Sequence, residues 1–259
     1  MRALALALAL LLSASASATE LPPPGPLPPT PAELARDRDA SIDRGIFNAH
    51  AETLGADSWA INSYELFLLG VSYGFTDDIQ ASITTLLPVV KDLPILFDLK
   101  GKFVVYRDAT TVMAAQARLL YISHPDEDDA IGTFAGAFLI DHYLDDRGRF
   151  AIHGGLQVGG LFGSFSDGGF DVADGAGITF ELGVSLGLSD LVKLHLEGWL
   201  PAVTTSAKFE FAKFGFVNYG IRFHGESVAA DLGFIYPAGD VDAGPIVMGW
   251  PFVSFSARL

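Results

Sequence analysis

Apolar and polar residues alternate with a period of two along most of the chain after about residue 56. Between Ser227 and Tyr236 every second residue is apolar or aromatic, and the residues between them are mostly small or polar. Because successive side chains of a strand point to opposite faces, this period predicts a strand with one apolar face. The segment 217–224 alternates in the same way and is joined to it by a short Gly-containing turn at 225–226, which predicts a hairpin.

The alternation predicts twelve strands, and an even number places both chain termini on the same side of a bacterial membrane barrel. We expect the strands at 57–63, 65–75, 79–88, 95–106, 110–123, 130–143, 149–162, 177–188, 191–202, 214–224, 227–236 and 249–259. The segment 57–75 also fits one long strand, which would change the count. Short turns are expected at 76–78, 144–148, 189–190 and 225–226, and longer loops on the other side at 163–177, 203–213 and 237–248. Such asymmetry is typical of outer-membrane barrels.

The last predicted strand runs to the end of the chain, with Val253, Phe255, Ala257 and Leu259 on one face. A strand at this position leaves an open edge, and pairing with the first strand would close it. The tail resembles the C-terminal strand by which bacterial outer-membrane barrels are recognised for assembly, although that strand usually ends in an aromatic residue and this chain ends in Leu259. The resemblance implies that the barrel-assembly machinery is a partner through these four residues.

The composition bears on whether the apolar faces contact membrane lipid or pack inside a soluble domain. Charged residues make up 18% of the chain and the mean hydropathy is +0.36, whereas about a quarter of the residues are charged in an average soluble domain. We therefore predict an all-β fold, a closed antiparallel transmembrane up-and-down β-barrel of about twelve strands with a short N-terminal periplasmic segment. A soluble secreted all-β domain is the alternative, because its strands alternate too.

The sequence of the N-terminal region predicts a targeting signal followed by a spacer. Residues 1–18 contain Arg2, an apolar run and the sequence Ala16-Ser17-Ala18, a pattern typical of a secretory signal peptide. Residues 19–45 are expected to form a Pro-rich tether and a short helix, since the order Thr30-Pro31-x-Glu33 is a capping box with proline at the first helical position. Residues 46–259 are the predicted barrel.

Charge and cysteine content exclude several classes of function. The chain has 31 acidic and 16 basic side chains and a net charge of −15, so nucleic acid is not an expected partner. Cysteine is absent, which excludes disulfides, thiolate metal sites and cysteine nucleophiles. The expected location is the bacterial outer membrane, and the expected surroundings are its lipid and lipopolysaccharide.

Several sequence blocks resemble a family of uncharacterised outer-membrane β-barrel proteins of Gram-negative bacteria. They are Asn48-Ala-His-Ala-Glu-Thr-Leu, Val71-Ser-Tyr-Gly-Phe-Thr-Asp-Asp-Ile, the hairpin 219–235 and Gly249-Trp-Pro-Phe-Val-Ser-Phe. The resemblance extends patchily from about residue 46 to the end. It implies the fold and the location and assigns no activity.

Charged residues on the polar faces of the predicted strands would point into one lumen. The candidates for lumen lining are Asp98, Lys100, Lys102, Arg118, Glu181, Lys193, His195, Glu197, Arg222, His224 and Asp231. They would either line a selective pore or fill the lumen with ion pairs, because twelve strands lie between the filled and the open size ranges.

The leading hypothesis is therefore a passive channel or facilitator for a small solute. The alternative is a plugged structural or ligand-binding barrel, and an outer-membrane enzyme acting on lipid or peptide is a more remote one. The six histidines show no ligand spacing that predicts a metal, and a Ser-His catalytic pair is not expected. We expect no cofactor and no enzymatic activity.

Overall fold

The computed structural model describes residues 28–45, 48–65, 67–87, 94–123, 130–164, 175–204, 209–211, 214–239 and 249–259. The predicted signal peptide and most of the Pro-rich tether lie outside these residues. Within the described part, the sole helix, α2 (Pro31–Arg38), is too short to cross a membrane.

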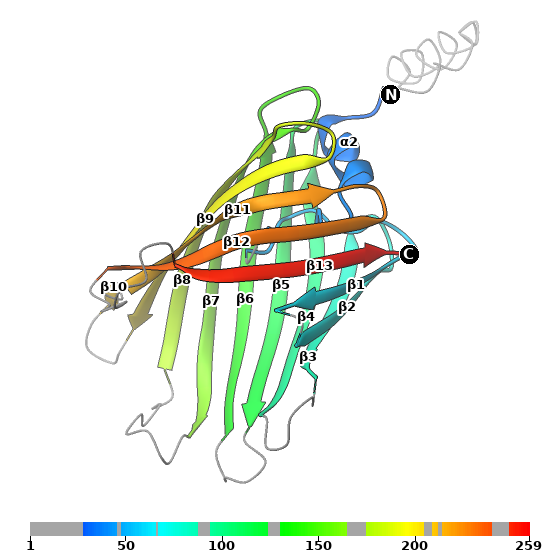
Figure 1. Ribbon diagram of the computed structural model, residues 1–259. Coiled ribbons are helices and arrows are strands. Elements are labelled where there is room, and N and C mark those ends of the chain that lie inside the picture. The colour runs from blue at the N-terminus through cyan, green and yellow to red at the C-terminus, as the bar shows by residue number, and fades with distance from the viewer. Residues whose placement is uncertain are drawn as a thin grey trace, which may run out of the picture.

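The protein is a closed antiparallel β-barrel of twelve strands (Figure 1). The strands are β1 (Ser58–Tyr64), β2 (Leu68–Gly74), β3 (Ile79–Leu86), β4 (Ile95–Arg107), β5 (Thr111–Ser123), β6 (Ala130–Tyr143), β7 (Phe150–Ser164), β8 (Gly175–Gly187), β9 (Val192–Thr204), β11 (Phe214–His224), β12 (Val228–Gly239) and β13 (Trp250–Arg258). A further short strand, β10 (Phe209–Phe211), pairs antiparallel with the end of β9. Each strand pairs with its sequence neighbours in the barrel, and β13 closes the ring on β1, with Ala60 opposite Arg258 and Tyr64 opposite Ser254.

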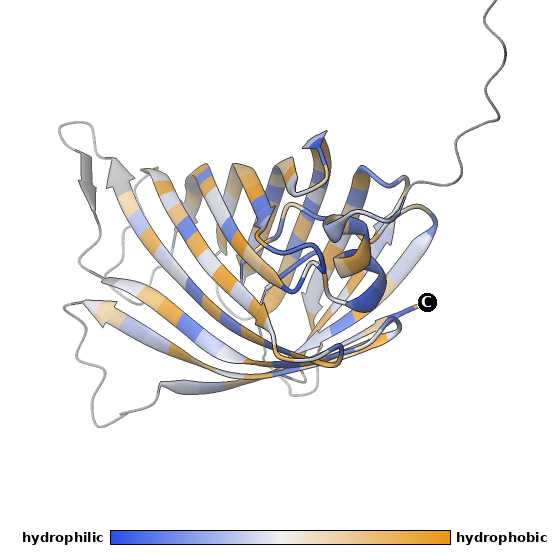
Figure 2. Cartoon of the chain, turned by 90° about the horizontal axis from the view of Figure 1, so that it is seen from above, coloured by the Kyte–Doolittle hydropathy of each residue, from blue (hydrophilic) through white to orange (hydrophobic). Residues whose placement is uncertain are grey.

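The two predicted faces of the strands are the outside and the inside of this barrel, and apolar and polar residues alternate along the strands (Figure 2). On β9, Lys193, His195 and Glu197 are buried, whereas Leu196 between them is 50% exposed. On β12, Leu232 is 51% exposed, whereas its neighbour Asp231 is buried. Large apolar side chains therefore cover the outer wall and polar side chains fill the interior.

The two rims differ as the sequence predicts. One rim carries the turns at 75–78, 108–110, 144–149, 188–191 and 225–227, together with the carboxyl end of β13, and is called the short-turn rim. The other carries the connections at 65–67, 87–94, 124–129, 165–174, 205–213 and 240–249, and is called the long-loop rim.

The predicted strand positions are confirmed, with most ends within three residues. The segment 57–75, for which two interpretations were possible, is a hairpin whose tight turn contains Glu65 at φ 50°. The loop predicted at 203–213 contains the end of β9 and the added strand β10, because the chain turns back and pairs with the end of β9.

The predicted helix is also present and closes part of the short-turn rim. Thr30 and Glu33 form the reciprocal capping box, with Pro31 at the first helical position. At the end of the helix, Arg38 donates to the carbonyl of Arg147 and accepts, through its own carbonyl, from His224. After α2 the chain enters the barrel, and the described residues 39–45 and 48–57 lie within or at the mouth of the lumen before β1 begins at Ser58.

Candidate functional site

The interior of the barrel is filled at the short-turn rim by the segment after α2. We call residues 39–57 the plug, of which 39–45 and 48–57 are described. Its residues hydrogen-bond to strands around the ring: β3, β4, β6, β9, β11 and β13. Because these strands lie on opposite sides of the barrel, the plug crosses the lumen rather than following one wall.

Buried ion pairs hold the first part of the plug. The Asp39 carboxylate accepts from Lys193 Nζ at 2.7 Å and from Arg222 Nη1 at 3.3 Å, and all three side chains are almost wholly buried. Burial by itself raises the pKa of Asp39, but the adjacent Lys193 and Arg222 hold that pKa well below its usual range. The carboxylate therefore stays ionised between its two cationic partners.

The guanidinium of Arg222 joins the plug to the wall with all of its donors. Nε and Nη2 donate to the two oxygens of Asp231 on the neighbouring strand β12, at 2.6 and 3.2 Å. Nη1 donates to the carbonyls of Ser41 and Arg44, and Nη2 to that of Gly45. An arginine holds five N–H groups in a fixed fork. The plug backbone places its three carbonyl oxygens where this one side chain can donate to all of them.

The second part of the plug is held by the opposite wall. Lys102 Nζ on β4 donates to the carbonyls of Asp43 and Glu52, at 2.9 and 2.8 Å. Asp141 on β6 accepts from the backbone N–H groups of Ala51 and Glu52, at 2.8 and 3.1 Å. Two wall side chains thus replace the hydrogen bonds that a plug without regular secondary structure lacks.

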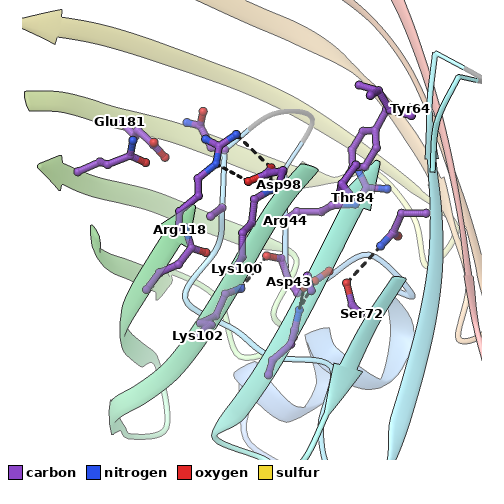
Figure 3. Close-up of a pocket in the computed structure, with 18 of the residues that line it drawn as sticks. Asp43, Arg44, Tyr64, Ser72, Thr84, Asp98, Lys100, Lys102, Arg118 and Glu181 are labelled. Atoms are coloured by element: carbon purple, nitrogen blue, oxygen red, sulfur yellow. Dashed lines mark hydrogen bonds and ion pairs between the residues drawn. The ribbon is translucent and has the colours of Figure 1, made fainter. Parts of the chain in front are cut away.

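A cavity of about 310 Å³ lies on the long-loop side of the plug. Asp43, Arg44, Asn48 and Ala49 of the plug form part of its lining, and residues from β1–β5, β7–β9 and β13 form the rest. The lining is polar and mixed in charge (Figure 3).

Two cations and one carboxylate form the charged centre of this cavity. Lys100 on β4 lies directly opposite Arg118 on β5 in the strand register. Two like charges in this position repel each other, and Asp98 bridges them: Arg118 donates to both of its carboxylate oxygens at 2.7 and 3.1 Å, and Lys100 Nζ lies 3.0 Å away. The side chains of Lys100 and Arg118 are still about 30% exposed, so these three groups together present one net positive charge to the cavity.

Glu181 on β8 adds an acceptor to the same cavity. Its Oε2 atom is buried and has no hydrogen-bond partner among the described residues. A buried acceptor without a partner is costly unless a ligand or water supplies the donor. The cavity therefore offers a cationic pair and a separate acceptor to a bound molecule.

The eleven predicted lumen residues fall into two groups by depth. Asp98, Lys100, Lys102, Arg118 and Glu181 line the cavity. Lys193, His195, Glu197, Arg222, His224 and Asp231 are buried beside the plug or α2. The plug residues that the second group contacts were not predictable from the sequence, because the plug has no strand period and follows no motif. His50, which precedes the first predicted strand in the sequence, lies deep inside the barrel.

The structure also places Ser185, His153 and Asp141 in one hydrogen-bonded chain. His153 Nδ1 lies 2.8 Å from Asp141 Oδ1, and its Nε2 lies 2.9 Å from Ser185 Oγ. These are the residue types and distances of a Ser-His-Asp hydrolase triad. All three are buried and none lines the cavity, while Asp141 holds the plug backbone. In this conformation Asp141 and His153 contact the plug, and all three side chains are buried away from the cavity.

No family model matches the sequence, and no curated protein matches it. Among solved structures, a rhombohedral crystal form of the porin NanC is similar at 6% sequence identity and a TM-score of 0.47, with 78% of this chain and 98% of that chain covered. A bacterial polysaccharide outer membrane secretin has 10% identity, a TM-score of 0.46 and coverage of 80% and 77%. The Acinetobacter baumannii outer membrane protein Omp33 has 10% identity, a TM-score of 0.37 and coverage of 78% and 95%. Likenesses this distant specify neither a solute nor an activity.

Proposed function

We propose that the chain is an integral outer-membrane β-barrel that binds a small polar solute in its cavity and admits it when the plug moves. The cavity carries this proposal: it is polar, it lies on the long-loop side, and the plug forms part of its lining. In outer-membrane barrels the longer loops are extracellular, so the cavity would be loaded from outside the cell.

The outer wall supports membrane insertion. Leu182, Phe134 and Leu196 are 65%, 60% and 50% exposed on β8, β6 and β9. Apolar side chains of this size on every side of a soluble barrel would favour aggregation, whereas in a bilayer they face hydrocarbon. The closed ring leaves no unpaired edge in that environment. Outer-membrane lipid would cover this wall, and β13 would be the strand that the assembly machinery binds.

The cavity chemistry favours a solute that has an anionic group and a hydrogen-bond donor. An anionic group would pair with Lys100 and Arg118, and the donor would reach Glu181 Oε2. A cavity of about 310 Å³ is at the lower end of the range for ligand pockets, roughly 300–1,000 Å³. The expected solute is therefore no larger than a small metabolite.

A permanently closed ligand-binding barrel is the second candidate function. The ion pairs of Asp39 with Lys193 and Arg222 favour it, because breaking buried pairs leaves uncompensated charges. Both functions share the cavity and differ in whether the plug moves.

Single-channel recording in planar bilayers tests the proposal. We expect the wild-type protein to be mostly closed with discrete openings, and the openings to favour anions because Lys100 and Arg118 lie on the path. A K100Q/R118Q variant should shift the reversal potential under a salt gradient toward cation selectivity. Arg147→Gln, in a turn of the short-turn rim outside the cavity, is the matched control and should leave the selectivity unchanged.

Two results would count against transport. A folded barrel with no openings would favour the closed ligand-binding alternative. Openings whose selectivity is the same in wild type and K100Q/R118Q would mean that ions do not pass the cavity.

A further inference from the structure

Three potential metal ligands meet where the plug touches β9. They are His50 of the plug and His195 and Glu197 of β9, and one ligand atom from each lies within 4.8 Å of the other two. All three side chains are buried. His195 and Glu197 are two residues apart on a strand and so share the inner face, while His50 reaches them from a distant part of the sequence.

The hydrogen bond of His50 leaves one ring nitrogen available as a ligand. His50 Nδ1 lies 3.2 Å from the carbonyl oxygen of Ile42. A carbonyl only accepts, so Nδ1 carries the proton and Nε2 keeps its lone pair. Nε2 is buried and has no hydrogen-bond partner among the described residues. The ring also stacks on His153, with centroids 3.7 Å apart and planes 4° apart, which fixes its orientation.

His195 is the second independent sign of a missing ligand. Both of its ring nitrogens are buried, and neither has a hydrogen-bond partner in the described part of the chain. A buried imidazole without any partner is rare in native proteins, and an absent ion is one of its ordinary explanations. Its ring centroid lies 6.3 Å from that of His50.

The Glu197 carboxylate packs directly against Gly45. A Cβ atom at Gly45 would overlap Glu197 Oε1 and would lie 3.1 Å from His50 Nε2. Only glycine at this position therefore lets the Glu197 carboxylate lie where it does beside the His50 ring. The other oxygen, Glu197 Oε2, accepts from the Asn48 N–H at 3.2 Å, which orients the carboxylate.

We propose that His50, His195 and Glu197 bind a divalent transition-metal ion, with Zn²⁺ as the best match, and that this ion cross-links the plug to the barrel wall. Two imidazoles and one carboxylate are a common protein ligand set for Zn²⁺. Ligands about 2.0–2.2 Å from one ion lie less than about 4.4 Å apart, so small side-chain rotations bring the three groups to bonding distance. In the neighbouring hydrogen-bonded series Asp141-His153-Ser185, both ring nitrogens of His153 are engaged in hydrogen bonds. We therefore leave His153 outside the ligand set.

Metal binding by the detergent-solubilised barrel tests the site. After chelator treatment, isothermal titration with Zn²⁺ should show one ion per chain, and Co²⁺ should give the visible absorption of a low-coordinate nitrogen and oxygen site. H50A, H195A and E197Q should each weaken Zn²⁺ binding by at least about 10- to 100-fold, since even outer-shell changes cost that much. Loss in H50A and in H195A alike would show that plug and wall share one ion.

Two further variants make the test specific. His142→Ala removes an imidazole of β6 that bonds Thr111 and lies outside the cluster, and it should bind Zn²⁺ like the wild type. Gly45→Ala keeps all three ligands, but its methyl group would displace the Glu197 carboxylate beside His50, so it should lose binding while its heat-modifiable migration shows a folded barrel. The proposal is overturned if the wild type binds no stoichiometric Zn²⁺, or if folded H50A or G45A binds as tightly as the wild type. Neither result depends on whether the barrel conducts.

Discussion

Removing the Asp39 carboxylate should release the plug. In Asp39→Asn, Lys193 Nζ loses the carboxylate 2.7 Å away, its ion-pair partner among the described residues, while Arg222 keeps its bonds to Asp231. Breaking a buried ion pair by removing one partner costs about 3–5 kcal/mol. At about 1.36 kcal/mol per tenfold change, the equilibrium between docked and released plug shifts by roughly 10²–10⁴. We expect a large rise in the open probability of single channels.

A double variant separates the ion pair from other effects of the substitution. In D39N/K193M neither side of the Asp39–Lys193 pair is charged, so most of the cost should disappear, because the cost comes from the unpaired buried ammonium. The open probability of the double variant should then return toward the wild-type value. An unchanged open probability in D39N, or a double variant as open as D39N, would refute the assignment of this pair as the anchor of the plug.

Two other predictions follow from the plug and from the outer wall. Lys193 and Arg222 depress the pKa of Asp39 despite its burial. The ionised carboxylate therefore stabilises the docked plug at pH values above its ordinary pKa, and this contribution is lost as the pH falls through the depressed pKa. The open probability should stay constant from about pH 8 to 5 and rise only below about pH 4, and D39N should lack this acid-dependent step. Leu232→Arg places a cation on the lipid face of β12 and should lower the free energy of unfolding from vesicles, measured in urea, by about 2–4 kcal/mol if it lies near the bilayer midplane. Ser227→Arg at the short-turn rim is its control and should cost about 1 kcal/mol or less, so equal costs at the two positions would contradict the assigned face.

The strands were predictable because each has a local signal. A strand in a two-faced wall must alternate, and Val228 to Tyr236 does so whatever its partners are. The hairpin at Glu65 was ambiguous for a local reason as well: a non-glycine residue with positive φ forms the turn, so no Gly, Pro or Asn marked it.

The plug was not predictable because its structure depends on distant partners. Asp39 and Lys193 are separated by 154 positions, and Asn48 and Glu197 by 149. A segment that fills a lumen adopts the backbone conformation that satisfies the hydrogen-bonding groups of the surrounding walls. Its sequence therefore has neither the strand period nor the helix period that would reveal its structure. The same holds for the His50 cluster, in which the strand supplies two ligands at a spacing that alone is weak evidence, and the third comes from the plug.

The seam at which β13 meets β1 depends on the plug as well as on its own ladder. The register there has five residue pairs, against thirteen between β5 and β6. Arg44 of the plug donates to Ser254 and Ser256 of β13, and Arg258 of β13 donates to the carbonyls of Arg36 and Leu54. The segment that precedes β1 thus fastens the last strand of the barrel. The proposed movement of the plug would break the same bonds that hold the seam. A firmly closed seam and an easily moved plug are therefore competing demands on these residues.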